Sequence, residues 1–384
     1  MTYPYLATFY LAMISIENPV RRSLKHGDES LAIRKLLDLS YESKKAEFQQ
    51  KAIEISRNYR KNDSNSWKEQ AAALSDQICS EPFAPFNPQK LIQAVGISKK
   101  YKGSNFKLNP VNLELNQGEV FGLVGENGNG KTTLLRILAG QLKLDEGSLS
   151  FPSFGAVDGF SVRGRVAFIP QRIPRWYGFL HDNLVFSAAL SGHYGNENTL
   201  MVDFMLERLN LAPYANLTWD QISSGYRTRF ELARILLFKP GLLILDEPLA
   251  NLDINAQQTI LSDLRDLAIS KRSPMGIILS SQQLHEVEKV ADAVIFIKNG
   301  GCFYQSQLGD MNESVIELET SASREQLEAI FSTDDVRIRY NGSYFSLSSS
   351  SLSGTELLEE LIKNKISIQY FRDITQSTKR FFNA

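Results

Sequence analysis

The segment Gly125-Glu126-Asn127-Gly128-Asn129-Gly130-Lys131-Thr132 fits the pattern G-x-x-x-x-G-K-[ST] at every fixed position. It follows an apolar run, Glu119 to Val124, and precedes a helical run that begins at Thr133. A strand, a glycine-rich turn and a helix in this order form the context in which the pattern binds phosphate. A chance glycine-rich turn would not explain both flanks, so the segment predicts an α/β fold with a phosphate-binding loop.

The residue types explain how this loop would hold a nucleotide. Glycines let the backbone turn so that successive N–H groups and the helix N-terminus face the phosphates. Lys131 adds a positive charge toward the β and γ oxygens, and Thr132 ligates magnesium. We therefore expect ATP and Mg²⁺ as cofactors. The residues expected to contact the nucleotide are Gly125, Glu126, Asn127, Gly128, Asn129, Gly130, Lys131, Thr132 and Thr133.

A second chemical element is the acidic pair Asp246-Glu247, which follows the apolar run Leu242 to Leu245. At the carboxyl end of a strand, Asp246 can hold magnesium through water, and Glu247 can orient and deprotonate an attacking water. Phosphoryl transfer needs this division of work. Taken alone, a solvated strand end explains the pair equally well. Beside the phosphate loop, the pair favours ATP hydrolysis.

Further apolar runs, Val166 to Ile169 and Gly276 to Leu279, alternate with helical patterns. This alternation predicts an α/β sheet within residues 90–310. Between Gln171 and Ser223 the pattern is mostly helical, so we expect a helical subdomain that interrupts the sheet.

Both flanking segments have a different character. Residues 1–89 are predicted to form an all-α extension, because apolar residues recur there at helical spacing, as at Trp67, Ala71, Leu74 and Ile78. Prolines close this extension and make a stiff connector. They are Pro82, Pro85 and Pro88. We therefore place a domain boundary at 89/90.

Residues 311–384 follow the order β-α-β-β-α-β of a ferredoxin-like α+β domain, with the turn Asn341-Gly342 in its middle. The expected strands are Val315–Glu319, Val336–Tyr340, Tyr344–Leu347 and Ile366–Phe371, and the expected helices are Arg324–Phe331 and Glu356–Lys363. No catalytic pattern is visible in this segment.

Together with Ile222-Ser223-Ser224-Gly225-Tyr226-Arg227, the phosphate loop and the acidic strand resemble the nucleotide-binding domain of ABC transporters over roughly residues 90–310. The resemblance implies a P-loop NTPase of ABC type, in which two domains pair head to tail. Ser223 and Gly225 would then contact the γ-phosphate held by a second copy or a homologous subunit. Ser224 and Tyr226 depart from the commonest residues of that signature, and a plain helix N-cap is the alternative for Ser223.

Other positions of the family follow in order. Tyr101 stands where an aromatic ring stacks on adenine, and Gln171 where a glutamine reaches magnesium and the attacking water. The alternatives are an ordinary packed tyrosine for Tyr101 and a solvated loop glutamine for Gln171. The order in which the family's motifs follow one another along the chain favours the functional interpretation of both. The segment Ala250-Asn251-Leu252-Asp253 occupies the loop that runs along the dimer seam in the family.

One position departs from the family. Its switch histidine is replaced by Gln282 in Ser281-Gln282-Gln283-Leu284-His285-Glu286. A glutamine can donate to phosphate but cannot titrate. The resemblance thus implies a catalytic set of Glu247, Gln171 and Gln282, with ATP binding, closure and hydrolysis retained. His285 could compensate for the missing histidine, but a solvated helix residue is favoured there.

The resemblance implies an ATP-hydrolysing subunit that powers a separate membrane permease by closure of the dimer. The segment Tyr370 to Ile374, with Ser377, Lys379, Arg380 and Phe381, resembles a small domain that follows the nucleotide-binding domain in some exporter ATPases. This second resemblance favours an exporter. The alternatives are a soluble ABC ATPase associated with ribosomes or nucleic acid, and an ATP-dependent regulatory switch.

Composition narrows these classes. A formal net charge of −1 gives no overall attraction to nucleic acid, so none is expected as a partner. Cys79 and Cys302 are the two cysteines, and they indicate neither a disulfide framework nor a zinc site. The apolar stretch Met1 to Ile16 is shorter than the ~20 residues of a spanning helix. We expect a cytoplasmic protein, peripheral at the inner face of the cell membrane.

Overall fold

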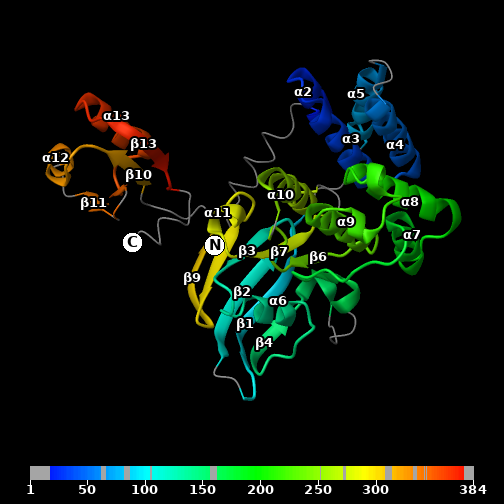
Figure 1. The fold of residues 1–384 in the computed structure, drawn as a ribbon, viewed down its shortest axis with the longest axis horizontal. Coiled ribbons are helices and arrows are strands. Elements are labelled where there is room, and N and C mark those ends of the chain that lie inside the picture. The colour runs from blue at the N-terminus through cyan, green and yellow to red at the C-terminus, as the bar shows by residue number, and fades with distance from the viewer. Residues whose placement is uncertain are drawn as a thin grey trace.

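The computed structural model describes residues 18–61, 66–81, 87–103, 106–155, 162–250, 252–270, 274–307, 314–331, 335–340, 342 and 344–375. Figure 1 shows three parts in sequence order: N-terminal helices, a central α/β part, and a C-terminal sheet with two helices. The boundaries 89/90 and 310/311 stay predictions. Several positions used in the sequence analysis lie outside the described residues, namely the stretch Met1 to Ile16 and the positions Pro82, Pro85, Asn251, Asn341, Ser377, Lys379, Arg380 and Phe381.

The N-terminal helical unit, residues 19–79, is built around one apolar core. Its helices are α2 (Pro19–Lys25), α3 (Glu29–Ser43), α4 (Ala46–Lys61) and α5 (Ser66–Cys79). The predicted apolar stripe is buried in this core at Trp67, Ala71, Leu74 and Ile78. Asp28 caps α3 by accepting a hydrogen bond from the Leu31 N–H, which explains where that helix begins.

The central part contains a six-stranded sheet with the order β5-β6-β7-β3-β8-β9. Its strands are β3 (Val120–Val124), β5 (Val166–Ile169), β6 (Leu242–Leu245), β7 (Gly276–Ser281), β8 (Ala293–Lys298) and β9 (Gly301–Gln307). All neighbouring pairs are parallel except β8 with β9, which is antiparallel. The four strands predicted from apolar runs are therefore confirmed, and they lie next to one another in the sheet.

Both faces of this sheet are covered. Leu243 and Leu245 join a core shared with the helices on one face, whereas Leu242 and Ile244 join a second core on the other. This alternation along one strand is the period of two that a sheet imposes. A strand buried on both faces has no polar side, which is why the sequence shows it as a continuous apolar run.

The second core separates the large sheet from an antiparallel sheet of order β2-β1-β4. Its strands are β1 (Lys90–Lys100), β2 (Lys107–Asn116) and β4 (Glu146–Ser150). The sequence analysis did not predict these strands, or β8 and β9. Polar side chains alternate with buried ones along β2, for example, so no continuous apolar run marks it.

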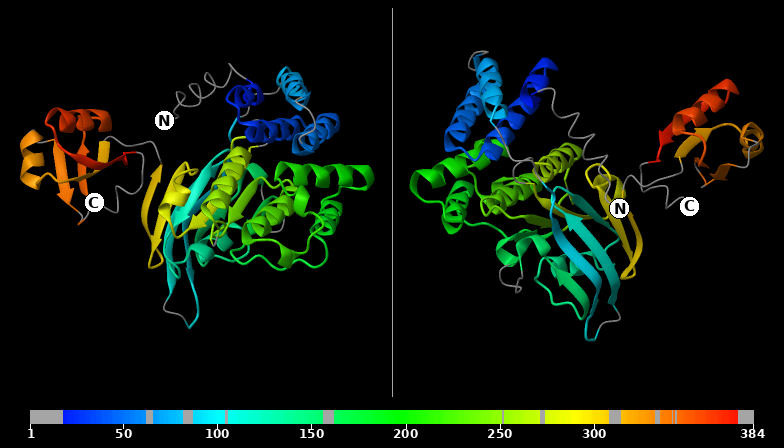
Figure 2. Two further views of the ribbon diagram at one scale, coloured as in Figure 1. Left: turned by 45° about the horizontal axis from the view of Figure 1, so that its top comes forward. Right: turned by 180° about the vertical axis from the view of Figure 1, so that it is seen from behind.

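Helices connect the strands of the central part. They are α6 (Lys131–Leu138), α7 (Leu180–Leu190), α8 (Gly195–Arg208), α9 (Ser224–Leu236), α10 (Ile254–Ala268) and α11 (Leu284–Val287), with short 3₁₀ turns at Pro152–Phe154, Val162–Gly164, Ala212–Tyr214 and Trp219–Gln221. The predicted helical subdomain between Gln171 and Ser223 contains α7 and α8. Figure 2 shows this subdomain at one end of the central part.

The C-terminal part has the strand order β11-β12-β10-β13, with all neighbours antiparallel. Its elements are β10 (Ser314–Thr320), α12 (Arg324–Ile330), β11 (Val336–Tyr340), β12 (Phe345–Ser349), α13 (Gly354–Lys363) and β13 (Ile368–Asp373). Element order and sheet order are those of a ferredoxin-like fold. Ser323 and Ser353 each form a capping box at the start of a helix.

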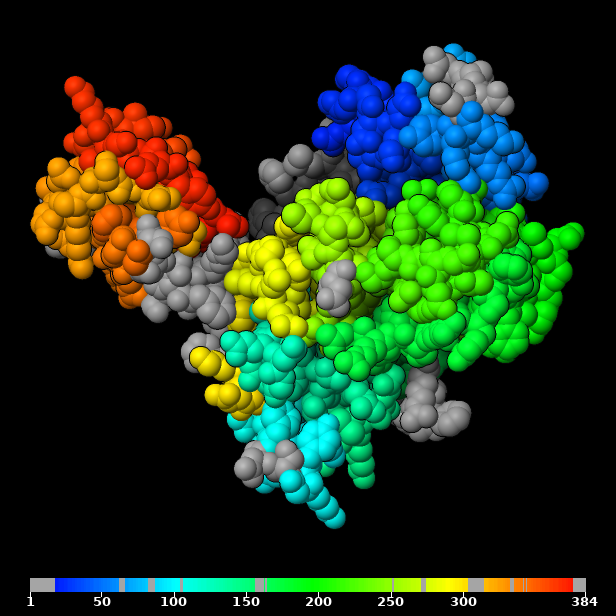
Figure 3. All heavy atoms as spheres, viewed as in Figure 1, coloured from blue at the N-terminus to red at the C-terminus, as the bar shows by residue number. Residues whose placement is uncertain are grey.

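The N-terminal helical unit lies against the region of α8 and α10, as the space-filling view of Figure 3 shows. None of the described helices combines the length and the apolar character needed to cross a membrane.

Candidate active site

The phosphate loop joins β3 to α6, as the sequence analysis expects. Gly130 caps α6 with a φ of 105°, a conformation that favours glycine. A Cβ atom at Gly125 would lie 2.3 Å from the carbonyl oxygen of Ile297 on β8. The first glycine is thus required by close approach of two backbones, and the last one by the backbone angle.

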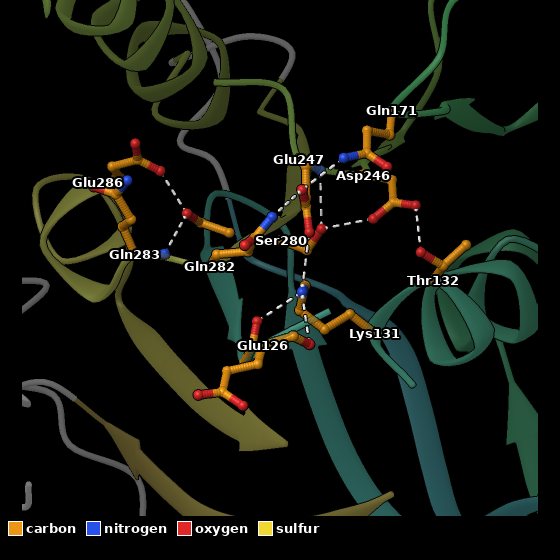
Figure 4. A network of polar contacts seen from close by, with 12 residues as sticks. Glu126, Lys131, Thr132, Gln171, Asp246, Glu247, Ser280, Gln282, Gln283 and Glu286 are labelled. Carbon is orange, nitrogen blue, oxygen red and sulfur yellow. Dashed lines mark hydrogen bonds and ion pairs between the residues drawn. The ribbon is translucent and has the colours of Figure 1, made fainter. Parts of the chain in front are cut away.

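Lys131 is the first residue of α6, and its side chain is buried. Its Nζ donates to the carbonyl oxygens of Gly125 at 2.6 Å and Glu126 at 3.2 Å, and lies 3.0 Å from Glu247 Oε1. Figure 4 shows this ammonium between the loop and the acidic strand end. The positive charge of the loop is therefore neutralised by Glu247.

The acidic pair follows β6 and meets the loop at the carboxyl end of the sheet. Thr132 Oγ1 donates to Asp246 Oδ2 at 2.7 Å, and Ser280 Oγ donates to Asp246 Oδ1 at 2.8 Å. A hydroxyl and a carboxylate side by side are the oxygen ligands that Mg²⁺ prefers, in a site that phosphate oxygens and waters complete. The residues present thus fit a magnesium ion bound together with ATP.

Glu247 is the point where the site residues converge (Figure 4). Its Oε2 accepts hydrogen bonds from Gln171 Nε2 at 2.7 Å and from Gln282 Nε2 at 2.8 Å. Its own N–H donates to Ser280 Oγ at 2.9 Å, and its φ is 49°. A non-glycine residue at positive φ is uncommon and is held in place by its surroundings.

Glu286, a buried residue of α11, contacts the segment that carries Gln282. Ser281 Oγ donates to Glu286 Oε2, and Gln257 Nε2 of α10 donates to Glu286 Oε1 at 3.1 Å and to the Leu249 carbonyl at 3.4 Å. These contacts join α10 to both the segment after Glu247 and the segment of Gln282.

The remaining expected residues are distributed around this centre. Asn129 Oδ1 accepts from the Asn299 N–H at 2.8 Å, which fixes the loop to the turn after β8. Tyr101 is partly exposed, and its hydroxyl lies 3.3 Å from Thr133 Oγ1. Tyr101, which the resemblance places at the adenine, therefore lies beside the start of α6. Asn127 and Gly128 are exposed at the tip of the loop.

Ser223 and Gly225 are not part of this cluster. Among the described residues, no hydrogen bond links them to the phosphate loop. Ser223 is the N-cap residue of α9, yet its side chain makes no capping hydrogen bond, so the plain N-cap alternative lacks its usual contact. Ser223 is exposed and Gly225 is buried within α9. His285 is exposed on α11, as the sequence analysis favoured.

Three functional candidates were missed from sequence. Ser280 bridges Asp246 and the Glu247 N–H, while Glu286 and Gln257 hold the segment of Gln282. The register of β6 with β7 pairs Leu245 with Leu279, so Ser280, the next residue of β7, lies beside Asp246, the residue that follows β6. The polar residues at the end of the apolar run Gly276 to Leu279 were the available signal.

Comparison with known proteins agrees with this geometry. The family model described as "ABC transporter" matches residues 108–250, which include the phosphate loop and the acidic pair. The ABC transporter ATP-binding protein NatA of Bacillus subtilis (strain 168) is 33% identical over 236 residues, which cover 59% of this chain and 89% of NatA. The chain belongs to the ABC transporter family. The resemblance stated from sequence is thus confirmed.

Other similar proteins give the same assignment. The hemin import ATP-binding protein HmuV of Shewanella denitrificans (strain OS217) is 32% identical over 204 residues, covering 50% of this chain and 78% of HmuV. Among solved structures, CbiO1 from Clostridium perfringens has a TM-score of 0.51 at 24% identity, over 56% of this chain and 88% of CbiO1. That likeness shows the fold alone.

As an ATP-binding subunit of an ABC transporter, this protein binds and hydrolyses ATP. The match to the family model leaves the N-terminal helical unit and the C-terminal part outside.

Proposed function

We propose that this ABC transporter subunit powers an exporter whose membrane permease is a separate chain. The single observation that supports the hydrolytic part is the convergence of Lys131, Gln171 and Gln282 on Glu247, next to the Thr132–Asp246 contact. The protein would lie at the cytoplasmic face of the membrane, bound to its permease.

The proposed roles follow the chemistry of each group. Glu247 is the general base for the attacking water, because it is the carboxylate nearest to Lys131 and is placed at the end of β6. Thr132, Gln171 and Asp246 are the proposed magnesium ligands. Gln171 and Gln282 orient the water and the γ-phosphate. The loop Gly125 to Thr133 binds the triphosphate, and Tyr101 stacks on the adenine.

We further propose that two nucleotide-binding parts close head to tail. Ser223 of one subunit would donate its hydroxyl, and Gly225 its N–H, to the γ-phosphate on the partner. The exposure of Ser223 and its lack of a capping hydrogen bond leave that hydroxyl available. The partner is a second copy of this chain or a homologous ATP-binding subunit.

The permease would contact the helical subdomain. Large apolar side chains are exposed on α7 and its flanking segments, at Tyr177, Phe179, Phe186, Leu190 and Tyr194. An exposed apolar patch of this kind marks an interaction surface. The exporter direction rests on the ferredoxin-like C-terminal part, which resembles the small domain of exporter ATPases.

The hydrolytic roles are tested with the purified full chain. Glu247→Gln keeps the size of the side chain and removes its basicity, so turnover is expected to fall by about 10²-fold or more while ATP binding persists. Lys131→Ala should lose ATP binding itself. An unchanged turnover in Glu247→Gln would refute the assignment of the base, and turnover near zero in the wild-type dimer would favour an ATP-dependent regulatory switch.

The partner is tested by affinity purification from native membranes. A multi-helix membrane protein should co-purify with the wild type, and less of it with Phe186→Ser/Leu190→Ser. Ile269→Ser is the matched control, because Ile269 is an exposed apolar residue outside the helical subdomain. Recovery of ribosomes or nucleic acid in place of a membrane protein would contradict the transport role.

A further inference from the structure

A cavity of about 550 Å³ lies between the central part and the C-terminal part. Its described lining residues are His285, Glu288 and Lys289, in and just after α11, and Arg372 of β13. Figure 1 shows α11 on the side of the central part that faces the C-terminal part. Small-molecule sites usually have volumes of about 300–1,000 Å³. None of the described residues of the phosphate loop or the acidic pair lines this cavity, so it is separate from the site of hydrolysis.

The wall formed by α11 stands on a fixed support. Glu286 and Val287 are buried, and Val287 belongs to the apolar core of the central part. The helix continues as a turn at residues 288–290. His285 and Lys289 are four residues apart, so they lie on one side of this helical segment, and both are exposed. The two basic side chains are therefore presented to the cavity by a segment whose other side is anchored in the core.

Arg372 reaches the cavity from the opposite side, on β13. Its neighbours Phe371 and Asp373 face the helices of the C-terminal part: Phe371 packs against their apolar core, and a Cβ at Gly354 of α13 would lie 2.4 Å from Asp373 Oδ2. Successive residues of a strand point to opposite faces of the sheet, so Arg372 points away from these helices. In the sheet it neighbours Glu317 of β10, yet no ion pair joins these two described residues.

The basic side chains of the cavity have no partner within the described part of the chain. No hydrogen bond or ion pair links the side chain of His285, Lys289 or Arg372 to another described residue. Glu288 supplies one negative charge, against the two permanent positive charges of Lys289 and Arg372. The described lining therefore has a net positive charge even when His285 is neutral.

This arrangement differs from an ordinary solvated surface. Exposed lysine and histidine side chains are usually scattered, but here basic groups from two parts with separate cores converge on one cavity. Like charges gathered in this way repel each other, and an anion placed between them turns the repulsion into attraction. A guanidinium presents a fork of N–H donors that matches a phosphate group, an ammonium adds a point charge, and an imidazole adds a ring donor. The chemistry therefore fits a phosphate group, and the volume leaves room for an organic part.

We propose that this cavity binds a small phosphorylated compound, which His285, Lys289 and Arg372 hold between them. Because the contacts come from α11 on one side and from β13 on the other, the bound anion fastens the C-terminal part to the central part. The site goes beyond the proposed transport function and does not depend on the roles assigned to Glu247 and Gln282.

Isothermal titration calorimetry tests binding on the full chain that carries Lys131→Ala, because this substitution is expected to remove phosphate binding at the loop. The probes are inorganic pyrophosphate and fructose 1,6-bisphosphate, each titrated without magnesium. At least one of them should bind with a Kd below about 1 mM. Tighter binding of the bisphosphate would identify an organic phosphate as the ligand class, and tighter binding of pyrophosphate would identify an inorganic one; both results support the site.

Neutral substitutions assign the binding to this cavity. In the same background, Lys289→Gln and Arg372→Gln each remove one positive charge and should weaken binding of the better probe about tenfold or more. Arg372→Lys keeps the charge without the fork of donors and should lose less affinity than Arg372→Gln. The matched control is Lys365→Gln, at an exposed lysine of the C-terminal part that does not line the cavity, and it should leave the Kd unchanged.

Hydrogen exchange on the wild type provides a second measurement that does not require Lys131→Ala to fold. Binding in the cavity should raise protection in residues 284–291 and in residues 368–373 together, whereas binding at the phosphate loop raises it in residues 125–133. Protection confined to the loop would overturn the proposal, and protection of only one wall would overturn the fastening.

The calorimetric outcomes are equally decisive. If neither probe binds, or if Lys289→Gln and Arg372→Gln both leave the Kd unchanged, the site is excluded. ATP turnover does not enter these measurements, so a chain without turnover would contradict the proposed hydrolytic roles alone.

Discussion

Gln282 Nε2 donates to Glu247 Oε2 across 2.8 Å. The residue that occupies the switch position therefore touches the proposed base directly, although it is an amide instead of an imidazole. An amide can orient a carboxylate or a phosphate but cannot carry a proton between them. We therefore predict that Gln282 positions Glu247 or the phosphate, and that this role does not depend on pH.

Replacement of Gln282 tests that role. Gln282→Ala removes one hydrogen bond to a charged group and is expected to lower kcat about tenfold, while ATP binding is unchanged. Gln282→His should restore turnover and add a pH dependence near the ordinary histidine pKa of about 6.5. The measurement is steady-state hydrolysis between pH 5.5 and 8.5, and an unchanged rate in Gln282→Ala would remove this residue from the site.

Because the backbone of Gly125 lies close to that of Ile297, a single methyl group at this position is expected to lower both stability and ATP binding. In Gly125→Ala the new Cβ meets the Ile297 carbonyl, so the loop must move. We expect a loss of about 1–3 kcal/mol in the free energy of unfolding, together with weaker ATP binding. Gly164→Ala is the control, because a Cβ there meets nothing within 4 Å. Equal stability of the two variants would show that the loop adapts at no cost.

Ser280 is expected to be essential for the acidic pair. Ser280→Ala removes the donor to Asp246 Oδ1 and the acceptor for the Glu247 N–H, both of which are buried. Leaving such groups unsatisfied costs about 1–3 kcal/mol. Urea denaturation should show a lower midpoint, and turnover should fall as well. Ser148→Ala, at an exposed position on β4, should change neither quantity.

The buried carboxyl of Asp263 is expected to make the free energy of unfolding depend on pH. Burial raises the pKa of its carboxyl to about 6. The positive charges of Arg229, Arg34 and Arg208 oppose this increase, and the negative charge of Asp38 adds to it. The folded state then binds a proton that the unfolded state releases near pH 3.8. This contribution is therefore present at low pH and is lost as the pH rises to about 6.

Asp263→Asn mimics the protonated carboxyl and should remove this dependence. Relative to the wild type, the variant is expected to be more stable at pH 8, by at most about 3 kcal/mol, and nearly equal at pH 4. Urea denaturation at both values measures the difference. A variant that is less stable at pH 8 would show that the ionised carboxylate favours the folded state.

The sequence predicts those residues of the site that belong to a recognisable local sequence pattern. The phosphate loop needs glycines at set offsets, and Glu247 follows a strand whose burial on both faces leaves a continuous apolar run. Ser280 and Glu286 have no such pattern. They join the site because β6 and β7 are neighbours in the sheet and because α11 folds back under Gln282.

The same difference between local sequence patterns and contacts made only in the folded chain explains which strands could be predicted. Four strands of the parallel sheet, β3, β5, β6 and β7, were predicted, whereas β1 and β2 mix charged and apolar residues and gain their order from pairing with each other. The contact between α3 and α10 could not be predicted either. Residues about 230 positions apart in sequence meet there, as Lys35 and Asp266 do, and each is an ordinary surface charge in its own helix.

The burial of Phe204 in the core of the N-terminal helices has a consequence for synthesis of the chain. Phe204 follows the end of α5, at Cys79, by 125 residues. On the ribosome, helices α2–α5 therefore emerge before the side chain that completes their core. Their final packing has to wait for α8, so this unit cannot reach its full set of native contacts until Phe204, 125 residues after Cys79, has been made.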